Sequence, residues 1–137
     1  GRRHWFASGT EPDEEVAAEA SASAHLLQIL DEMYRGYQES RLVLDEARSI
    51  ARGREPSTGM VLVGGQIAGS TTRSLRHDTI AFEITPYRDV EPSARDRIDV
   101  AADRCGRFFG RRAVVRVAER RTDRHASGGP TVDPTQI

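Results

Sequence analysis

The side chains that most often carry out enzyme chemistry are few and scattered in this chain. One cysteine, Cys105, and four histidines occur among 137 residues, and the histidines lie in four separate segments. A lone cysteine forms no internal disulfide, and no two histidines have the spacing of metal ligands on one helix face. These residues therefore predict no catalytic nucleophile, no metal site and no cofactor. The single cysteine favours a reducing, cytoplasmic compartment.

Carboxylates are more numerous, but their spacing does not suit acid–base catalysis. Asp31 and Glu32 are adjacent, as are Asp45 and Glu46. Neighbouring side chains on a helix point about 100° apart, so such a pair does not share a proton as a catalytic acid and base must. We interpret these carboxylates as solvated charges or as charges in the first turn of a helix, and the sequence predicts no catalytic residue.

Arginine is unevenly distributed along the chain. All twenty basic residues are arginine, and the net charge is −1. Residues 91–121 contain nine arginines and five acidic residues, which leaves a local charge of +4. Such a segment could contact phosphates, although a solvated helix face with mixed charges has the same composition. The charge distribution alone leaves both interpretations open.

The composition indicates one domain with loose ends. No stretch approaches the roughly 18 consecutive apolar residues of a membrane span. Residues 1–24 are small, acidic and rich in Ala and Ser, which predicts a linker or a frayed helix. We expect a folded module over residues 25–120 and a disordered tail over residues 121–137, where Gly and Pro recur without an apolar period. Because the first residue is Gly rather than Met, we expect either a start codon further upstream, with this chain as the tail of a longer protein, or a remaining tag scar.

The module begins with a helical pattern. Apolar residues recur three and four positions apart, as on one face of a helix, at Leu26, Leu27, Leu30, Met33, Tyr34 and Tyr37. Gly36 predicts that this helix ends or bends there, because glycine is unfavourable inside a helix. A second, short helical segment is predicted from Val43 to Ile50.

After Met60 the pattern changes to that of strands. Met60–Val63 and Gln66–Leu75 predict the two strands of a hairpin, with two glycines between them as the turn. A second turn over residues 76–78 leads to a third strand, Thr79–Ile84, whose alternate residues are apolar. Together these segments predict a three-stranded antiparallel meander.

A long helix and a last strand complete the predicted module. Pro92 is suited to the first turn of a helix, and Gly110 is placed to cap its end. The predicted buried stripe is Ala94, Ile98, Ala101, Cys105 and Phe108. Ala113–Val117 predicts the final strand. The fold class is therefore α+β, with an N-terminal helical segment, the meander, the long helix and the final strand in a small sheet or partly closed barrel.

Three motifs resemble those of a known family and follow its order. The pairs Leu26-Leu27, Asp31-Glu32 and Gly36-Tyr37 match the pattern L-L-P-x-F-D-E-Y-x-x-G-Y of the winged-helix DNA glycosylases of the AlkZ type. The family's V-x-G-x-hydrophobic-x-G-T-W-R-R stretch is similar to a strand pair containing Val63, Gly65, Ile67, Gly69 and Arg73. The family's closing helix is similar to a segment containing Gly106, Phe108 and Gly110. The resemblance extends from residue 25 to about residue 118.

This resemblance implies a DNA repair protein that excises alkylated bases. It also implies tandem winged helices ahead of this region, with a catalytic Gln-x-Gln motif. The glutamines of this chain are Gln28, Gln38, Gln66 and Gln136, and no two of them are two positions apart. The activity is therefore not carried over to this chain. We expect a C-terminal module whose partner is DNA or the winged-helix domains of a longer chain, and the sequence does not indicate its oligomeric state.

The matched region also departs from the family pattern. Thr71 and Thr72 stand where the pattern has Trp and the first Arg. A Trp-Arg pair on a hairpin could contact a nucleic acid or pack within the fold. His25, Asp31 and Arg41 could likewise contact DNA. We favour a hydrogen bond within the fold for His25, and a structural ion pair or hydrogen bonds to loop backbone for Asp31 and Arg41.

The best candidates for phosphate contacts are arginines near the predicted second turn and the end of the long helix. They are Arg73, Arg76, Arg107, Arg111 and Arg112. Cations at a helix C-terminus also stabilise the helix dipole, which requires no DNA. Our first hypothesis is a non-catalytic DNA-associated module that binds the phosphate backbone weakly.

Two other hypotheses remain open. A structural or protein-interaction domain would be favoured by exposed Leu26, Leu30 or Phe109, since bare apolar surface marks a missing partner. The third hypothesis is a DNA glycosylase in its own right, with an active site outside the family motif.

Overall fold

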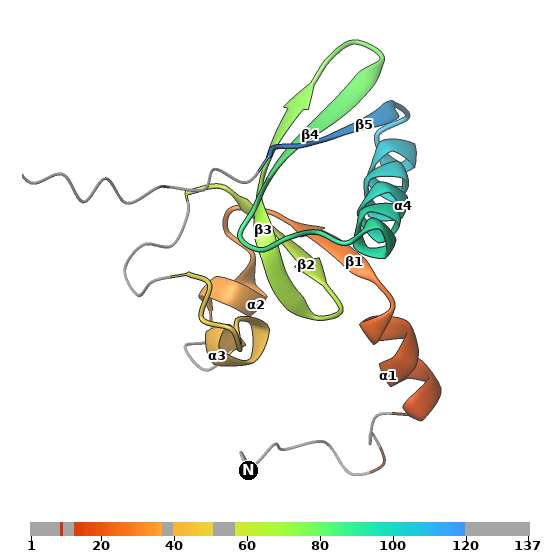
Figure 1. Cartoon of the computed structure of the whole chain (residues 1–137). Helices are drawn as coiled ribbons and strands as arrows, with labels where there is room; N and C mark the ends of the chain where they lie inside the picture. Colours follow the sequence, from red (N-terminus) through yellow and green to blue (C-terminus); the bar gives the residue numbers. More distant parts are fainter. Residues whose placement is uncertain (1–8, 10–12, 37–39, 51–56, 120–137) are drawn as a thin grey trace, which may run out of the picture.

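The computed structural model describes residues 9, 13–36, 40–50 and 57–119. Five strands form one sheet in the order β1-β2-β3-β4-β5 (Figure 1). They are β1 Ala24–Leu27, β2 Gly59–Val63, β3 Gln66–Leu75, β4 Thr79–Pro86 and β5 Arg112–Val117. The pairs β1–β2, β2–β3 and β3–β4 are antiparallel, whereas β5 runs parallel to β4. The predicted α+β fold is confirmed, and the predicted tail over residues 121–137 lies outside the described residues.

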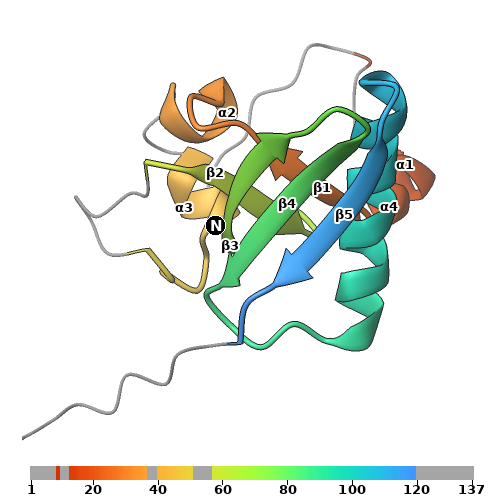
Figure 2. The same ribbon diagram turned by 90° about the horizontal axis from the view of Figure 1, so that it is seen from above.

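Helices cover both faces of this sheet. They are α1 Glu14–Ser21, α2 Glu32–Arg35, α3 Ser40–Leu44 and α4 Pro92–Phe108. α4 packs on one face and mainly contacts the two edge strands, β1 and β5, so the curled sheet and the helix form a half-barrel (Figure 2). α2 and α3 lie on the opposite face (Figure 1). No helix of the described segments is long and apolar enough to cross a membrane.

β2 is buried on both faces because it lies between these two layers. Val61 and Val63 belong to the core cluster that contains α4 residues. Met60 and Leu62 point the other way and pack with Tyr34 of α2. Alternate residues of a strand face opposite sides, so a continuous apolar run is the pattern expected for a strand covered on both sides.

The predicted helix at His25 is wrong, because residues Ala24–Leu27 form β1. This strand pairs with β2, with Leu26 opposite Val61 and Leu27 opposite Met60. The two leucines therefore reach different core clusters, which a strand allows and one helix face does not. The helix is limited to α2, where the Asp31 carboxylate caps the first turn by accepting a hydrogen bond from the N–H of Met33 at 3.0 Å.

The second helical prediction holds only in part. α3 ends at Leu44, well before Ile50. Asp45 follows it, and its carboxylate accepts hydrogen bonds from the N–H groups of Ser49 at 2.7 Å and Ile50 at 3.0 Å. A carboxylate that bonds to the following backbone stabilises a turn in competition with the helix. The segment after Leu44 is therefore a turn.

The meander and the long helix are confirmed. Gly64 and Gly65 form the hairpin turn with φ angles of 59° and 74°. Ile80, Phe82 and Ile84 are buried, as their alternation predicts. The chain leaves α4 at Gly110, whose φ of 62° is typical of a glycine after a helix end.

Phe108 is the exception in the predicted stripe, since 84% of it is exposed. The stripe repeats every 3.5 residues on average, whereas a straight helix turns every 3.6, so its members drift by about 20° per heptad. After two heptads the stripe has rotated off the buried face. Ala102 and Gly106 are buried instead, while Cys105 is half-buried.

Tyr87 follows β4 and packs on the side of α2 and α3. Burial raises the pKa of its phenol above the ordinary value of 10.0. The Asp45 carboxylate also raises this pKa, and a hydrogen bond with Ser70 lowers it. The folded protein therefore holds the phenolic proton more tightly than the unfolded chain. This contribution to stability is complete below the unfolded pKa and is lost as pH rises through the folded one.

We expect Tyr87→Phe to flatten the loss of stability at alkaline pH. The wild-type urea midpoint should fall more steeply above about pH 10 than that of the variant, because only the wild type must ionise the Tyr87 phenol, whose pKa is raised in the folded protein. The measurement is a series of urea unfolding curves for both proteins between about pH 8 and pH 11. If the urea midpoint falls equally steeply with pH in both proteins, Tyr87 does not cause the loss of stability at alkaline pH.

Candidate nucleic-acid interface

The β3–β4 turn and the loop from α4 to β5 meet at one end of the sheet (Figure 1). The backbone N–H of Arg112 donates to the carbonyl oxygen of Asp78 at 3.0 Å. The Arg111 guanidinium donates to the carbonyl oxygen of His77, also at 3.0 Å. These bonds extend the parallel pairing of β5 with β4, which begins with Thr79 opposite Arg112. Two segments more than thirty residues apart are therefore held side by side.

This junction collects all five predicted phosphate candidates. We call the set the arginine end, and it consists of Arg73, Arg76, Arg107, Arg111 and Arg112. Residues 73–78 and 107–112 contain these five arginines and one acidic residue, Asp78, so their net charge is +4. No ion pair with a carboxylate is formed by these five side chains within the described part of the chain.

Arg73 is oriented by an aromatic ring. Its guanidinium carbon lies 5.3 Å from the ring centroid of Phe109, which follows α4. Phe109 in turn packs edge-on against Phe108, with ring centroids 5.2 Å apart. Cation–π contacts at exposed sites contribute about 0.5–1 kcal/mol. A guanidinium has five N–H donors, so Arg73 can also donate to an acceptor.

The other four arginines of the arginine end differ in exposure and in their contacts. Arg111 is half-buried, and its bond to His77 gives it a structural role in the junction. Arg76, Arg107 and Arg112 are exposed. Arg107 lies in the last turn of α4, where its charge also stabilises the helix dipole. Exposed arginines beside a structural one form a surface suited to phosphate oxygens.

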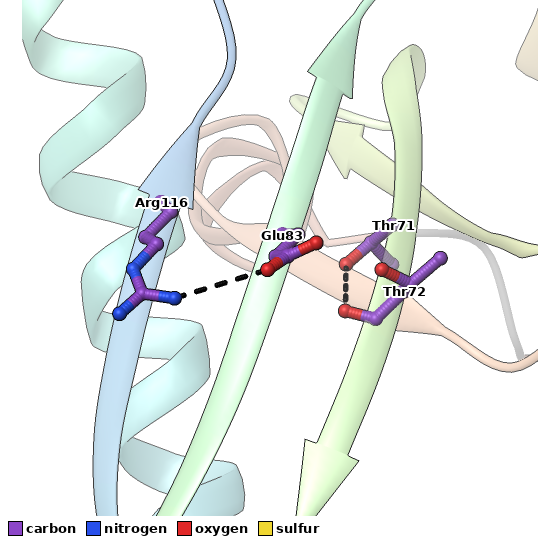
Figure 3. A network of polar contacts seen from close by, with 4 residues as sticks. All are labelled: Thr71, Thr72, Glu83 and Arg116. Carbon is purple, nitrogen blue, oxygen red and sulfur yellow. Dashed lines mark hydrogen bonds and ion pairs between the residues drawn. The ribbon is translucent and has the colours of Figure 1, made fainter.

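The neighbouring Arg116 does not add to this charge. It is opposite Glu83 in the β4–β5 pairing, and the two side chains form an ion pair with an N–O distance of 3.8 Å (Figure 3). The pair lies on the sheet face away from α4. Exposed pairs of this kind contribute about 1 kcal/mol or less because water screens them.

The family-motif residues lie apart from the arginine end and have structural positions. Asp31 caps α2, Glu32 begins it and Gly36 ends it. Gly65 belongs to the β2–β3 turn, and Tyr37 lies outside the described residues. Gly69 approaches β4 so closely that a Cβ there would lie 2.6 Å from the carbonyl oxygen of Thr85. The two glycines of the hairpin, Gly65 and Gly69, therefore occupy positions where a side chain would be strained or would clash.

The three other candidates make hydrogen bonds within the fold. His25 Nε2 lies 3.0 Å from the hydroxyl of Ser23. Arg41 Nε donates to the carbonyl oxygen of Tyr34 at 3.3 Å, and its guanidinium lies over the Tyr34 ring. Asp31 bonds to the backbone of Met33. The preference for internal bonds over contacts with DNA agrees with these distances.

A groove that the sequence did not predict opens beside Arg73. Its volume is about 280 Å³, and Thr71, Phe82 and Cys105 contribute to its lining. Thr71 is only 6% exposed, and its hydroxyl donates to the carbonyl oxygen of Thr72 at a long 3.4 Å (Figure 3). The lining comes from four strands and a helix, so no local spacing could have indicated it. Among the described residues, no group of three His, Cys, Asp or Glu side chains could hold a metal ion.

The sequence model of the AlkZ-like DNA glycosylases matches residues 1–108. The chain belongs to this family. The predicted resemblance is thus confirmed, and the match includes residues 1–24, which were predicted to be a linker or a frayed helix. In this AlkZ-like chain, Arg73, Arg76 and Arg107 lie within the matched region, and Arg111 and Arg112 follow it.

A solved structure that is similar to the AlkZ-like chain is the DNA glycosylase AlkZ of Streptomyces sahachiroi. The sequence identity is 20% and the TM-score is 0.37 over 70% of this chain. The alignment covers 26% of the Streptomyces protein, so the chain spans about a quarter of that protein's length. No curated protein sequence matches the chain.

Proposed function

We propose that this AlkZ-like chain is a non-catalytic DNA-associated module whose arginine end binds phosphates. The observation that supports it is the junction of the β3–β4 turn with the α4–β5 loop, which gathers five arginines and one aspartate. Guanidinium groups form charge-assisted and often bidentate hydrogen bonds to phosphate oxygens. The absence of a Gln-x-Gln motif from the sequence supports a binding role rather than base excision by this chain.

Binding by this module should be weak and insensitive to base sequence. Phosphate contacts position a protein on DNA but do not distinguish bases. Within a DNA repair protein, such a module would hold the duplex while other residues perform the excision. The single cysteine favours a cytoplasmic location for this role.

Replacing two exposed arginines should reduce both the affinity and its dependence on salt. Each phosphate contact adds about 0.9 to the slope of log K against log salt concentration for duplex DNA. The double variant Arg76→Gln, Arg112→Gln should therefore lower the slope by about 2 and weaken binding at least tenfold at about 50 mM salt. Fluorescence anisotropy of a labelled duplex, titrated at several salt concentrations from about 50 to 200 mM, measures both quantities.

A matched control is available at the other end of the module. Arg88 follows β4 and Arg95 lies near the start of α4, and both are exposed. Arg88→Gln, Arg95→Gln removes the same charge and should leave the slope nearly unchanged. Equal losses for the two double variants would attribute binding to net charge, and a wild-type affinity independent of salt would reject the phosphate contacts.

A structural or protein-interaction domain is the second candidate, because large apolar side chains are bare. Leu30 is 74% exposed, and Phe108 and Met33 are also exposed. Phe109 is partly exposed and Leu26 is half-buried. Binding of a hydrophobic dye without any binding of DNA would favour this function over phosphate contact. A monodisperse monomer that binds no dye would count against it.

A further inference from the structure

The most exposed large apolar side chain of the described residues lies at the arginine end. Phe108 is the last residue of α4, whose C-terminal end lies beside the start of β5 (Figure 1). It is 84% exposed, more than Leu30 at 74%. A single bare apolar side chain is ordinary on a protein surface, so the role of Phe108 has to be inferred from its neighbours.

The Phe108 ring is held by a row of three side chains. It packs edge-on against Phe109, with ring centroids 5.2 Å apart and an angle of 88° between the ring planes. The Arg73 guanidinium lies over the Phe109 ring, 5.3 Å from its centroid. Arg73 belongs to β3, so the row connects the end of the helix to the sheet. A ring that is already ordered by packing loses little side-chain freedom when it binds.

The charge around Phe108 indicates the class of its partner. Residues 104–112 contain four arginines and no acidic residue. An apolar protein surface placed on this ring would bring no charges to balance the arginines. Duplex DNA carries about one negative charge per 1.7 Å of its axis, and its base pairs present flat apolar faces beside those charges. A duplex therefore complements both the aromatic ring and the arginines.

We propose that Phe108 inserts between two stacked base pairs of a duplex as an apolar wedge, while the arginine end binds the phosphates on either side. Phenylalanine is one of the side chains that proteins insert in this way, and insertion partly unstacks the base step and kinks the duplex. The inference deepens the proposed function and rests on it, because the arginines hold the duplex against the ring. Phosphate contacts alone leave the base pairs stacked, so the wedge has a signature of its own.

The experiment uses the full chain and two labelled duplexes. The first spans about one helical turn, roughly 10 base pairs, which limits the number of registers, and carries 2-aminopurine at its two central positions. The fluorescence of 2-aminopurine rises when the base loses stacking, and we expect saturating protein to raise it about twofold or more at about 50 mM salt. The second duplex, of about 20 base pairs, carries a dye at each end and should show increased energy transfer, since a wedge kinks DNA by about 20–90°.

Phe108→Ala should abolish both signals and leave the salt slope unchanged, because it removes no phosphate contact. Its affinity should fall by less than about tenfold, since the lost stacking is offset by the unstacking that no longer occurs. Phe108→Leu keeps an apolar wedge and should keep both signals. Leu30→Ala is the matched control, because Leu30 is also highly exposed but lies just before α2, outside the arginine end. Phe108 is exposed, so its replacement should change the urea midpoint little.

Each outcome separates the wedge from the arginine end. Salt-dependent binding by the wild type, without a rise in fluorescence or in energy transfer, would overturn the wedge and leave the proposed function intact. Signals that persist in Phe108→Ala would also overturn the wedge. If neither duplex binds, both proposals are wrong. Binding to vesicles of anionic phosphatidylserine in place of the duplexes would likewise overturn both and would assign Phe108 to a membrane surface.

Discussion

Ile98→Ala is expected to lower the free energy of unfolding by about 2–5 kcal/mol, the usual cost of removing a large aliphatic side chain from a core. Ile98 is 1% exposed, and it lies near the middle of α4 in a cluster with Val61, Val63 and Ile84. These partners come from β2 and β4, so the side chain joins the helix to the central strands. A domain of this size has a total stability of roughly 5–15 kcal/mol, so the change removes a large share of it.

Val100→Ala is the control for this prediction. Val100 lies two residues further along α4, but it is 64% exposed. Its truncation should change the free energy of unfolding by less than about 0.5 kcal/mol, as for most surface substitutions. Urea unfolding followed by circular dichroism compares both variants with the wild type. A loss below about 1 kcal/mol for Ile98→Ala would mean that α4 does not depend on this contact.

Gly106→Ala is expected to destabilise the protein even though alanine is the better helix former. Alanine normally stabilises a helix interior by about 1 kcal/mol relative to glycine. A Cβ at Gly106, however, would lie 2.6 Å from the carbonyl oxygen of Arg111 and 3.1 Å from the N–H nitrogen of Ala113. Overpacking of this kind costs about 1–3 kcal/mol, so we expect a net loss.

The same substitution should weaken DNA binding if the arginine end acts as proposed. The backbone that must move carries Arg111 and Arg112, and the Arg111 N–H donates to the carbonyl oxygen of Gly106 at 2.9 Å. Thermal unfolding and the anisotropy titration together test both effects. Asp99→Ala, on the exposed side of α4, is the control. An increase in stability for Gly106→Ala would show that the loop moves aside at little cost.

Local patterns were sufficient for the part of the fold that is built from neighbouring segments. The two glycines between Val63 and Gln66 determine a tight hairpin, and the alternation in β4 determines its buried face. Pro92 and Gly110 mark the two ends of α4. In each case the signal lies within a few residues of the structure that it specifies.

β1 could not be predicted in this way because its identity depends on distant residues. Leu26 and Leu27 fit a helix face as well as a strand, and the choice is made by pairing with β2, more than thirty residues further along the chain. Turn-forming bonds of Asp45 likewise ended α3 earlier than the apolar spacing suggested. Tertiary pairing overrode local preference at β1, whereas at α3 local side-chain–backbone bonds overrode the apolar spacing.

The residues of the candidate site could be predicted from the sequence, but their proximity in space could not. The five arginines were identified from their places near a turn and a helix end. Their proximity depends on the parallel pairing of β5 with β4, which the sequence pattern did not specify. The groove is lined by residues of four strands and one helix, so no local spacing in the sequence indicates it.

The place of β5 at the margin of the sheet has a consequence for aggregation. Among the described strands β5 pairs only with β4, so its other side presents backbone groups that a strand of another molecule could join. Its sequence is RAVVRV, in which Val114 and Val115 are adjacent apolar residues of high strand propensity. Arg112 and Arg116 flank this pair. Charges on an edge strand oppose its pairing with a strand of another molecule. The arginine-rich composition on which the proposed phosphate surface depends is therefore also expected to oppose self-association.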